Sequence, residues 1–169
     1  DHKKWIGIAP FAAFKGKMYP IDLMEQVIKQ LGETYKILLF GGGAQEQKVL
    51  NAIQENNPSC VSLLGTLSLD EELDVIANLD VMLAMDSGNA HMAAMMGVAV
   101  VTLWGVTHPY AGFSPFNQPE HYNILADRKK FPLIPTSVYG NKAPEAYLEA
   151  MRTITPNTIV DKVKSILKA

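Results

Sequence analysis

Short apolar segments alternate with helix-forming segments at regular intervals as far as Trp104, and this alternation is the strongest constraint on the fold. Apolar runs typical of strands covered on both faces occur at residues 5–9, 35–40, 61–64, 80–85 and 98–103. Helix-forming segments lie between them, at residues 21–31, 45–56, 69–79 and 89–96. Parallel strands joined by helices of this length require right-handed crossovers. The sequence therefore predicts an α/β fold: a Rossmann-like, doubly wound parallel sheet of five strands in a three-layer α/β/α arrangement.

The length of 169 residues corresponds to a single domain, residues 1–169, whose predicted core is residues 5–109. Residues 104–144 hold six of the ten prolines. Because proline breaks both helices and strand ladders, this region is predicted to be mostly loop, with room for one short strand at residues 122–125. Residues 145–169 return to a helical pattern.

Several predicted helices have recognisable start signals. Ser68 and Glu71 have the spacing of a capping box, in which each side chain bonds the backbone N–H of the other residue. Thr155 and Pro156 are typical of a cap followed by a first helical turn. The two C-terminal helices are therefore predicted at residues 145–152 and 157–168.

Composition excludes several classes of protein. The net charge is −2, and no basic stripe occurs beyond residues 128–130, so a nucleic-acid partner is not expected. The single cysteine, Cys60, excludes an internal disulfide framework and lies in an apolar stretch typical of a buried, inert thiol. No H-E-x-x-H, cysteine pair or D-x-D motif is present, so neither a metal nor another cofactor is predicted.

The start of the chain carries no targeting signal. Residues 1–5 are mostly polar and lead directly into the first predicted strand, with no apolar core or cleavage site of a signal peptide. No apolar run approaches the ~18 residues that a transmembrane helix needs. These features predict a cytosolic chain, and the abrupt start predicts that it was cut from a longer one.

Polar residues crowd the turn between the strand at residues 80–85 and the helix that follows it. Asp86, Ser87, Gly88 and His91 all lie there. In an open α/β sheet this turn is at the carboxyl end of the strands, where ligands bind. Alternatively, Asp86 or Ser87 is a simple helix cap and His91 a core residue. The crowding of four such groups favours a binding site.

Three further loops follow predicted strands and could contribute to the same site. The small residues of the loop at 10–17 allow close approach to an anion, and Lys15 or Lys17 can add a positive charge; alternatively the loop is merely exposed. Gly41 to Gly43 with Glu46 suits a nucleotide ribose, although such turns also occur without a ligand.

The third loop holds Thr107 and His108, which either reach a ligand or shape the turn. Ser87 lacks the preceding glycine of a nucleophile elbow, so a nucleophilic serine is not predicted.

In this order, the segments resemble the C-terminal domain of the ADP-heptose:lipopolysaccharide heptosyltransferase family (glycosyltransferase family 9, GT-B type). The resemblance runs from Ile6 to Pro109. It is most specific from Ala77 to Thr107, where a D-[ST]-G-x-x-H-x-A-A turn precedes a small-residue strand and a G-x-T segment.

The resemblance implies a role for each matching residue. Lys17 matches the lysine that meets the donor diphosphate, and Glu46 matches the acidic residue near the ribose. The residues that would surround the diphosphate and sugar are Asp86, Ser87, Gly88 and His91, with Thr107 beside them. Lys17 and the helix start would stabilise charge on the departing diphosphate, whereas Asp86, an anion, would cap the helix or accept sugar hydroxyls.

Two positions depart from the family pattern. Ala12 and Ala13 stand where the family often carries hydroxyl residues that touch the phosphates. At these positions only backbone N–H groups remain for the donor, which puts the identity of the donor in doubt.

By resemblance, the chain is the C-terminal half of a GT-B fold that binds an ADP-heptose-like donor. The N-terminal domain, which carries the acceptor site and the catalytic Asp in the family, is absent from this sequence. No catalytic residue is therefore assigned, and the chain alone is expected to be inactive. The complete enzyme would transfer heptose to lipopolysaccharide inner core at the cytoplasmic face of the inner membrane. The alternatives are the donor domain of another GT-B transferase with a different nucleotide sugar, and a non-catalytic nucleotide-sugar-binding module.

Overall fold

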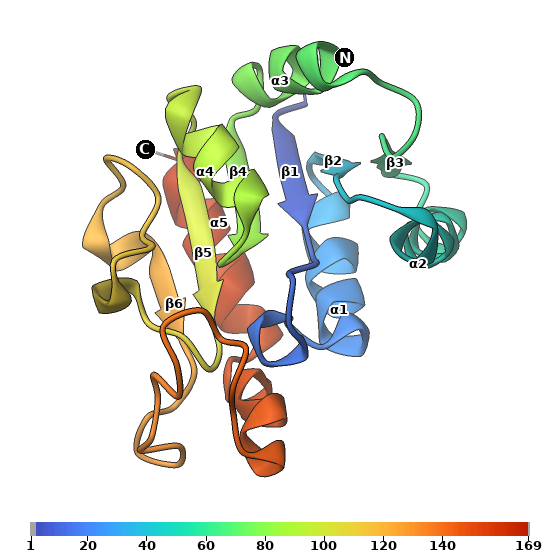
Figure 1. The fold of residues 1–169 in the computed structure, drawn as a ribbon. Helices are drawn as coiled ribbons and strands as arrows, with labels where there is room; N and C mark the ends of the chain where they lie inside the picture. The colour runs from blue at the N-terminus through green and yellow to red at the C-terminus, as the bar shows by residue number, and fades with distance from the viewer. Residues whose placement is uncertain (1–2, 169) are drawn as a thin grey trace.

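The computed structural model describes residues 3–168, and within them six strands form one parallel sheet (Figure 1). The strands are β1 (Trp5–Ala9), β2 (Lys36–Leu39), β3 (Cys60–Ser62), β4 (Val81–Met85), β5 (Val100–Trp104) and β6 (Asn123–Leu125). Their order across the sheet is β3-β2-β1-β4-β5-β6, which is the order of a Rossmann fold. The first two residues of the predicted polar start, Asp1 and His2, lie outside the described residues, as does Ala169 at the end of the last predicted helix.

Helices cover both faces of this sheet, as a doubly wound fold requires. The helices are α1 (Ile21–Gly32), α2 (Ala44–Asn56), α3 (Leu69–Ala77), α4 (Gly88–Met95) and α5 (Pro156–Lys168). Successive residues of a strand point to opposite faces. Leu83 of β4 packs in a core with residues of α1, α2 and α5, whereas its neighbours Met82 and Ala84 pack with residues of α3 and α4. The predicted three-layer α/β/α arrangement is confirmed.

The sheet has one strand more than the five expected. β6 pairs in parallel with β5 and forms the edge of the sheet. It lies within residues 122–125, where the sequence allowed a short strand that was not counted among the five. The Trp104 indole N–H donates to the Asn123 side-chain oxygen at 2.7 Å. This bond links the last residue of β5 to the first residue of β6. The rest of the proline-rich region is loop with short 3-10 turns, as predicted.

The predicted helix starts are confirmed by their hydrogen bonds. Ser68 and Glu71 form the capping box, with the Ser68 N–H donating to the Glu71 carboxylate at 2.8 Å. The Thr158 N–H donates to the Thr155 hydroxyl at 3.2 Å at the start of α5. The helical segment before it is a 3-10 helix, η4 (Glu145–Thr153), rather than an α-helix.

Within residues 3–168, no helix combines the length and apolar character that a membrane span needs.

Candidate functional site

The order of the strands creates a crevice at one end of the sheet. Chain order reverses between β1 and β4, so the loops after these two strands diverge to opposite faces, and the arrowheads of both strands point to the same end in Figure 1. Ligands of open α/β sheets bind at such a switch point. A cavity of about 210 Å³ lies there. It is lined by Ala9, Phe11, Ala12, Phe40, Gly41, Gly42, Glu46, Ser87 and Asn89, which come from the loops after β1, β2 and β4.

Asp86, the first residue after β4, is the centre of a buried polar network beside this crevice. Its Oδ2 accepts a hydrogen bond from the Thr107 hydroxyl at 2.9 Å and pairs with the Lys17 ammonium, also at 2.9 Å. Asp86 and Thr107 are buried, and the Lys17 side chain is 12% exposed. Thr107 lies 21 positions after Asp86 in the sequence, and Lys17 lies 69 positions before it. Asp86 therefore does not cap α4, and that alternative from the sequence is wrong: Lys17 and Thr107 hold its carboxylate instead.

The turn that carries Lys17 is fixed by close backbone packing. Lys17 ends a short 3-10 helix, η1 (Lys15–Lys17), whose central Gly16 accepts a hydrogen bond from the Val106 N–H at 3.0 Å. A Cβ on Gly16 would lie 2.8 Å from the Val106 side chain, so a larger residue would push the turn away from β5. Lys15, on the same turn, is exposed and lies 3.7 Å from the Glu149 carboxylate. Lys17, rather than Lys15, therefore faces the polar network.

The start of α4 presents donors to the crevice that no described side chain satisfies. Ser87 is the N-cap residue, but its side chain makes no capping hydrogen bond. Its hydroxyl is buried and has no hydrogen-bond partner among residues 3–168. A Cβ on Gly88 would meet open space. Unsatisfied N–H groups and the helix dipole make such a terminus favourable for an anion.

Glu46 also lines the crevice, and a hydrogen bond holds its carboxylate in place. It lies in the first turn of α2, and its Oε2 accepts the Gly42 N–H at 2.6 Å. Gly43 precedes the helix with a φ of +87°, a left-handed conformation that favours glycine. This bond fixes the carboxylate against the glycine turn, and the second carboxylate oxygen is left for a ligand.

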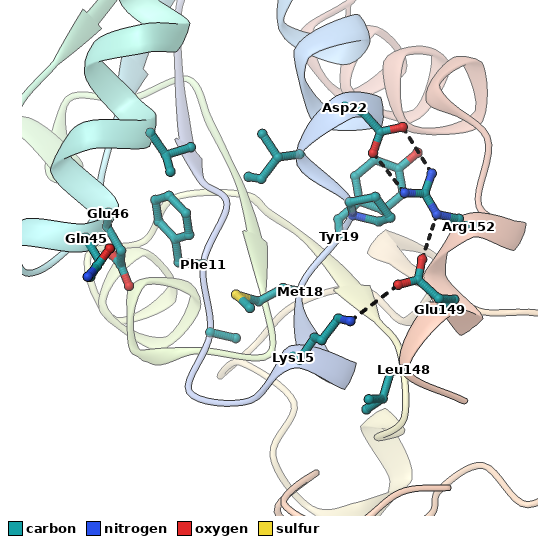
Figure 2. Close-up of a pocket in the computed structure, with 14 residues that line it drawn as sticks. Phe11, Lys15, Met18, Tyr19, Asp22, Gln45, Glu46, Leu148, Glu149 and Arg152 are labelled. Atoms are coloured by element: carbon teal, nitrogen blue, oxygen red, sulfur yellow. Dashed lines mark hydrogen bonds and ion pairs between the residues drawn. The ribbon is translucent and has the colours of Figure 1, made fainter. Parts of the chain in front are cut away.

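A larger cavity, of about 520 Å³, adjoins the crevice and shares Phe11, Ala12 and Glu46 with it (Figure 2). The cavity has a polar group of residues on each side, and the apolar Phe11 and Met18 lie between them. Gln45 and Glu46 form one of these sides. The other side is a chain of ion pairs. It is formed by Lys15, Glu149, Arg152 and Asp22.

These charges neutralise each other. Arg152 donates to both carboxylate oxygens of Asp22, at 3.0 and 3.1 Å, and to Glu149 at 2.6 Å. The hydrogen bond from Arg152 lowers the pKa of Asp22. Each of these four charged side chains already has a partner of opposite charge. The larger cavity is therefore a less favourable binding site for an anion than the crevice.

Two titratable groups near the site have shifted pKa values. Burial raises the pKa of Glu72 on α3, against a smaller opposing effect of its hydrogen bond with Asn89. Burial, with the charge of Arg128 as a smaller cause, lowers the pKa of His108. The His108 Nδ1 accepts the Tyr110 N–H at 3.2 Å, so this residue shapes the turn after β5.

The structure brings together most of the residues that the sequence indicated. Lys17, Asp86 and Thr107 share one hydrogen-bonded network, and Ala12, Glu46 and Ser87 line the crevice beside it.

The remaining candidates lie further out. Ala13 is exposed, Gly88 is exposed at the first position of α4, and His91 is partly buried on α4 and does not line either cavity. Phe11 and Asn89 line the crevice but were not predicted, although Asn89 lies within the Asp86 to His91 segment. Within residues 3–168, no group of three His, Cys, Asp or Glu side chains is arranged to hold a metal ion.

The chain was compared with known protein families and with proteins of known function. The sequence model described as "Glycosyltransferase family 9 (heptosyltransferase)" matches residues 1–133. The chain is 28% identical to lipopolysaccharide heptosyltransferase 2 of Escherichia coli (strain K12) over 175 residues, covering 99% of this chain and 48% of that protein. It is 25% identical to lipooligosaccharide heptosyltransferase 2 of Campylobacter jejuni over 171 residues, covering 98% of this chain and 52% of that protein.

A solved structure extends this likeness to the fold. The structure of E. coli ADP-heptose lps heptosyltransferase II superimposes with a TM-score of 0.72 at 25% identity, covering 98% of this chain and 47% of that one. The chain thus spans about half the length of the relatives it matches. The family match extends over most of the sequence and includes every loop that forms the crevice, so this chain belongs to glycosyltransferase family 9, the heptosyltransferases.

Proposed function

We propose that this chain is the donor-binding half of a heptosyltransferase that transfers heptose from an ADP-heptose-like nucleotide sugar to the inner core of lipopolysaccharide. The observation that carries the proposal is that Lys17, held by Asp86, occurs together with a Ser87 hydroxyl at the start of α4 that has no partner among residues 3–168. Both kinds of donor lie at the switch point of the sheet. The related E. coli structure is that of an ADP-heptose lps heptosyltransferase.

In this proposal the donor diphosphate lies across the start of α4 and the Lys17 ammonium. A lysine ammonium has three N–H donors, and Asp86 accepts one of them, so the others remain for phosphate oxygens. The Ser87 hydroxyl and the first N–H groups of α4 add neutral donors and the positive end of the helix dipole. Glu46 would accept a ribose hydroxyl through the oxygen that Gly42 does not use.

The chemistry requires charge stabilisation where these donors are. The bond between the anomeric carbon and the diphosphate oxygen breaks, and its electron pair leaves with the diphosphate. Donors that are already oriented towards that oxygen stabilise the developing charge without a reorganisation cost. The acceptor hydroxyl forms the new bond, and its proton goes to a base on the other half of the enzyme. No metal is needed for this distribution of roles, and the isolated chain binds the donor without transferring the sugar.

Asp86 acts as the positioning group for Lys17. Its buried carboxylate holds the ammonium at 2.9 Å, next to the residue that begins the turn into α4, and Thr107 restrains the carboxylate in turn. A negative charge next to a diphosphate opposes binding, which the pairing with Lys17 offsets. We place the complete enzyme in the cytoplasm, at the inner face of the membrane that holds its acceptor.

One observation favours a second candidate, a related transferase with a different nucleotide sugar. Ala12 lines the crevice and supplies no hydroxyl there, so at this position only the backbone can contact a phosphate. Competition between ADP and UDP distinguishes these donors.

The two lysines of η1 provide a matched test. Lys17→Ala removes a charge-assisted hydrogen bond of about 1.5–3 kcal/mol, so ADP affinity should fall by roughly 10- to 150-fold in calorimetry. Lys15→Ala removes an equal charge from the same turn but an exposed one, 67% accessible, and should change affinity by less than about threefold. Circular dichroism establishes that both variants are folded. Equal effects of the two substitutions would contradict the proposed diphosphate site.

A further inference from the structure

The segment at residues 136–142 lies against the polar network although it is outside the residues that the family model matches. Its Gly140 is buried, with a φ of +74°. A Cβ placed on Gly140 would lie 2.6 Å from the Lys17 Cδ, 2.8 Å from its Cγ and 2.9 Å from the Thr107 Cγ2. The backbone of Gly140 is therefore in direct contact with the stem of Lys17 and with the methyl group of Thr107.

Hydrogen bonds anchor this segment to the end of β5. The Thr136 N–H donates to the Val106 carbonyl at 2.9 Å, and the Thr136 hydroxyl donates to the Lys142 carbonyl at 2.7 Å. The Lys142 N–H in turn donates to the Ser137 hydroxyl at 3.2 Å. The segment is thus a closed loop anchored at the residue before Thr107, and Gly140 is held in place over Lys17.

This contact restricts a side chain that is otherwise flexible. A lysine has a four-carbon stem and loses rotamer entropy when it is ordered. The turn of η1 fixes its backbone, Asp86 fixes its ammonium, and Gly140 covers the methylene groups between them. The stem is already ordered before any ligand arrives, so that entropy is not lost on binding.

We propose that Gly140 is a positioning residue for the donor diphosphate, acting through Lys17. This inference rests on the proposed function and assigns to the C-terminal loop a part in the donor site. Any side chain at position 140 displaces the Lys17 stem and moves its ammonium away from the start of α4. The effect on a ligand is confined to groups that Lys17 meets.

The test compares two glycines that have similar backbones and different surroundings. Gly140→Ala and Gly112→Ala both place a side chain at a positive φ, +74° and +98°, but a Cβ at Gly112 meets open space. Gly140→Ala should weaken ADP binding about tenfold and adenosine binding less than twofold, whereas Gly112→Ala should leave both unchanged. In a Lys17→Ala background, Gly140→Ala should cause no further loss of ADP affinity, because the Lys17 stem and ammonium through which it acts are gone, although its contact with the Thr107 methyl group remains.

A second variant covers the case in which Gly140→Ala fails to fold. Thr136→Val removes the hydrogen bond to Lys142 and loosens the loop without adding a clash, and it should weaken ADP binding several-fold. Unchanged ADP affinity in a folded Gly140→Ala variant, or in Thr136→Val, overturns the inference, as does an equal loss for Gly140→Ala with and without Lys17. If the unaltered chain binds no ADP, the proposed function itself fails, and the two failures are distinguished.

Discussion

The contribution of the Thr107 hydroxyl to the free energy of unfolding can be predicted because the side chain is fully buried. Thr107 is 1% exposed, and its hydroxyl donates to Asp86 at 2.9 Å. Thr107→Val keeps the shape of the side chain but removes that donor. A hydrogen bond to a charged group contributes about 1.5–3 kcal/mol. Asp86 retains its pair with Lys17, so we expect the lower part of that range, about 2 kcal/mol.

The measurement is urea unfolding followed by circular dichroism, with a thermal melt in parallel. At 2–4 °C per kcal/mol for a chain of this size, Thr107→Val should lower Tm by roughly 4–8 °C. Thr107→Ser keeps the hydroxyl and loses only the methyl group, at a cost of about 1 kcal/mol. An unchanged m-value establishes that the comparison concerns the folded state. If Thr107→Val is as stable as Thr107→Ser or more so, the buried network does not hold the site together as described.

Three further predictions concern single side chains. Ser87→Ala removes a buried hydroxyl that has no partner among the described residues, so the free energy of unfolding should be unchanged or higher by up to about 1 kcal/mol. Calorimetry should show several-fold weaker ADP binding by this variant. Lower stability with unchanged ADP binding would contradict the proposed site. The lowered pKa of His108 means that the unfolded chain takes up its proton first, at a pKa of about 6.5. The stability that follows from keeping His108 neutral is fully present above that pH and is lost as pH falls through it. The free energy of unfolding in urea should therefore decrease between pH 7.5 and pH 5, and this decrease should be smaller in His108→Asn. An equal decrease in both proteins would argue against a shifted His108. Burial raises the pKa of the Cys60 thiol to about 11, so a thiol reagent at pH 8 should label the unfolded chain and spare the folded one, and equal labelling rates would be inconsistent with that burial.

The architecture could be predicted from the sequence because its determinants are local. Apolar runs such as Val81–Met85 and end signals such as the capping box at Ser68 depend on neighbours within a few residues. β6 was harder to predict because it has three residues, follows a proline-rich stretch, and depends on pairing with β5. The helix η4, which is 3-10 rather than α-helical, packs against a distant turn, η1, and that contact has no signal in the local sequence.

The sequence indicated which residues belong to the site but not which of them bond to one another. The polar turn at Asp86 and the lysine at position 17 were both visible in the sequence, yet their ion pair joins the connections that follow two different strands, β1 and β4. Asp86 was predicted in the donor site with a helix cap as the alternative, because a carboxylate before a helix is usually a cap and its distant partners have no local signal. The role of Gly140 had no sequence signal at all, since its function is the absence of a side chain at a tertiary contact.

The central claim, a nucleotide diphosphate seat between Lys17 and the start of α4, is tested most directly by calorimetric titration of the chain with ADP and with UDP. We expect ADP to bind weakly, at micromolar to millimolar concentrations, but more tightly than UDP and more tightly than adenosine. A clear preference for UDP would move the donor to another nucleotide sugar. The absence of binding by either nucleotide at millimolar concentration would contradict the account.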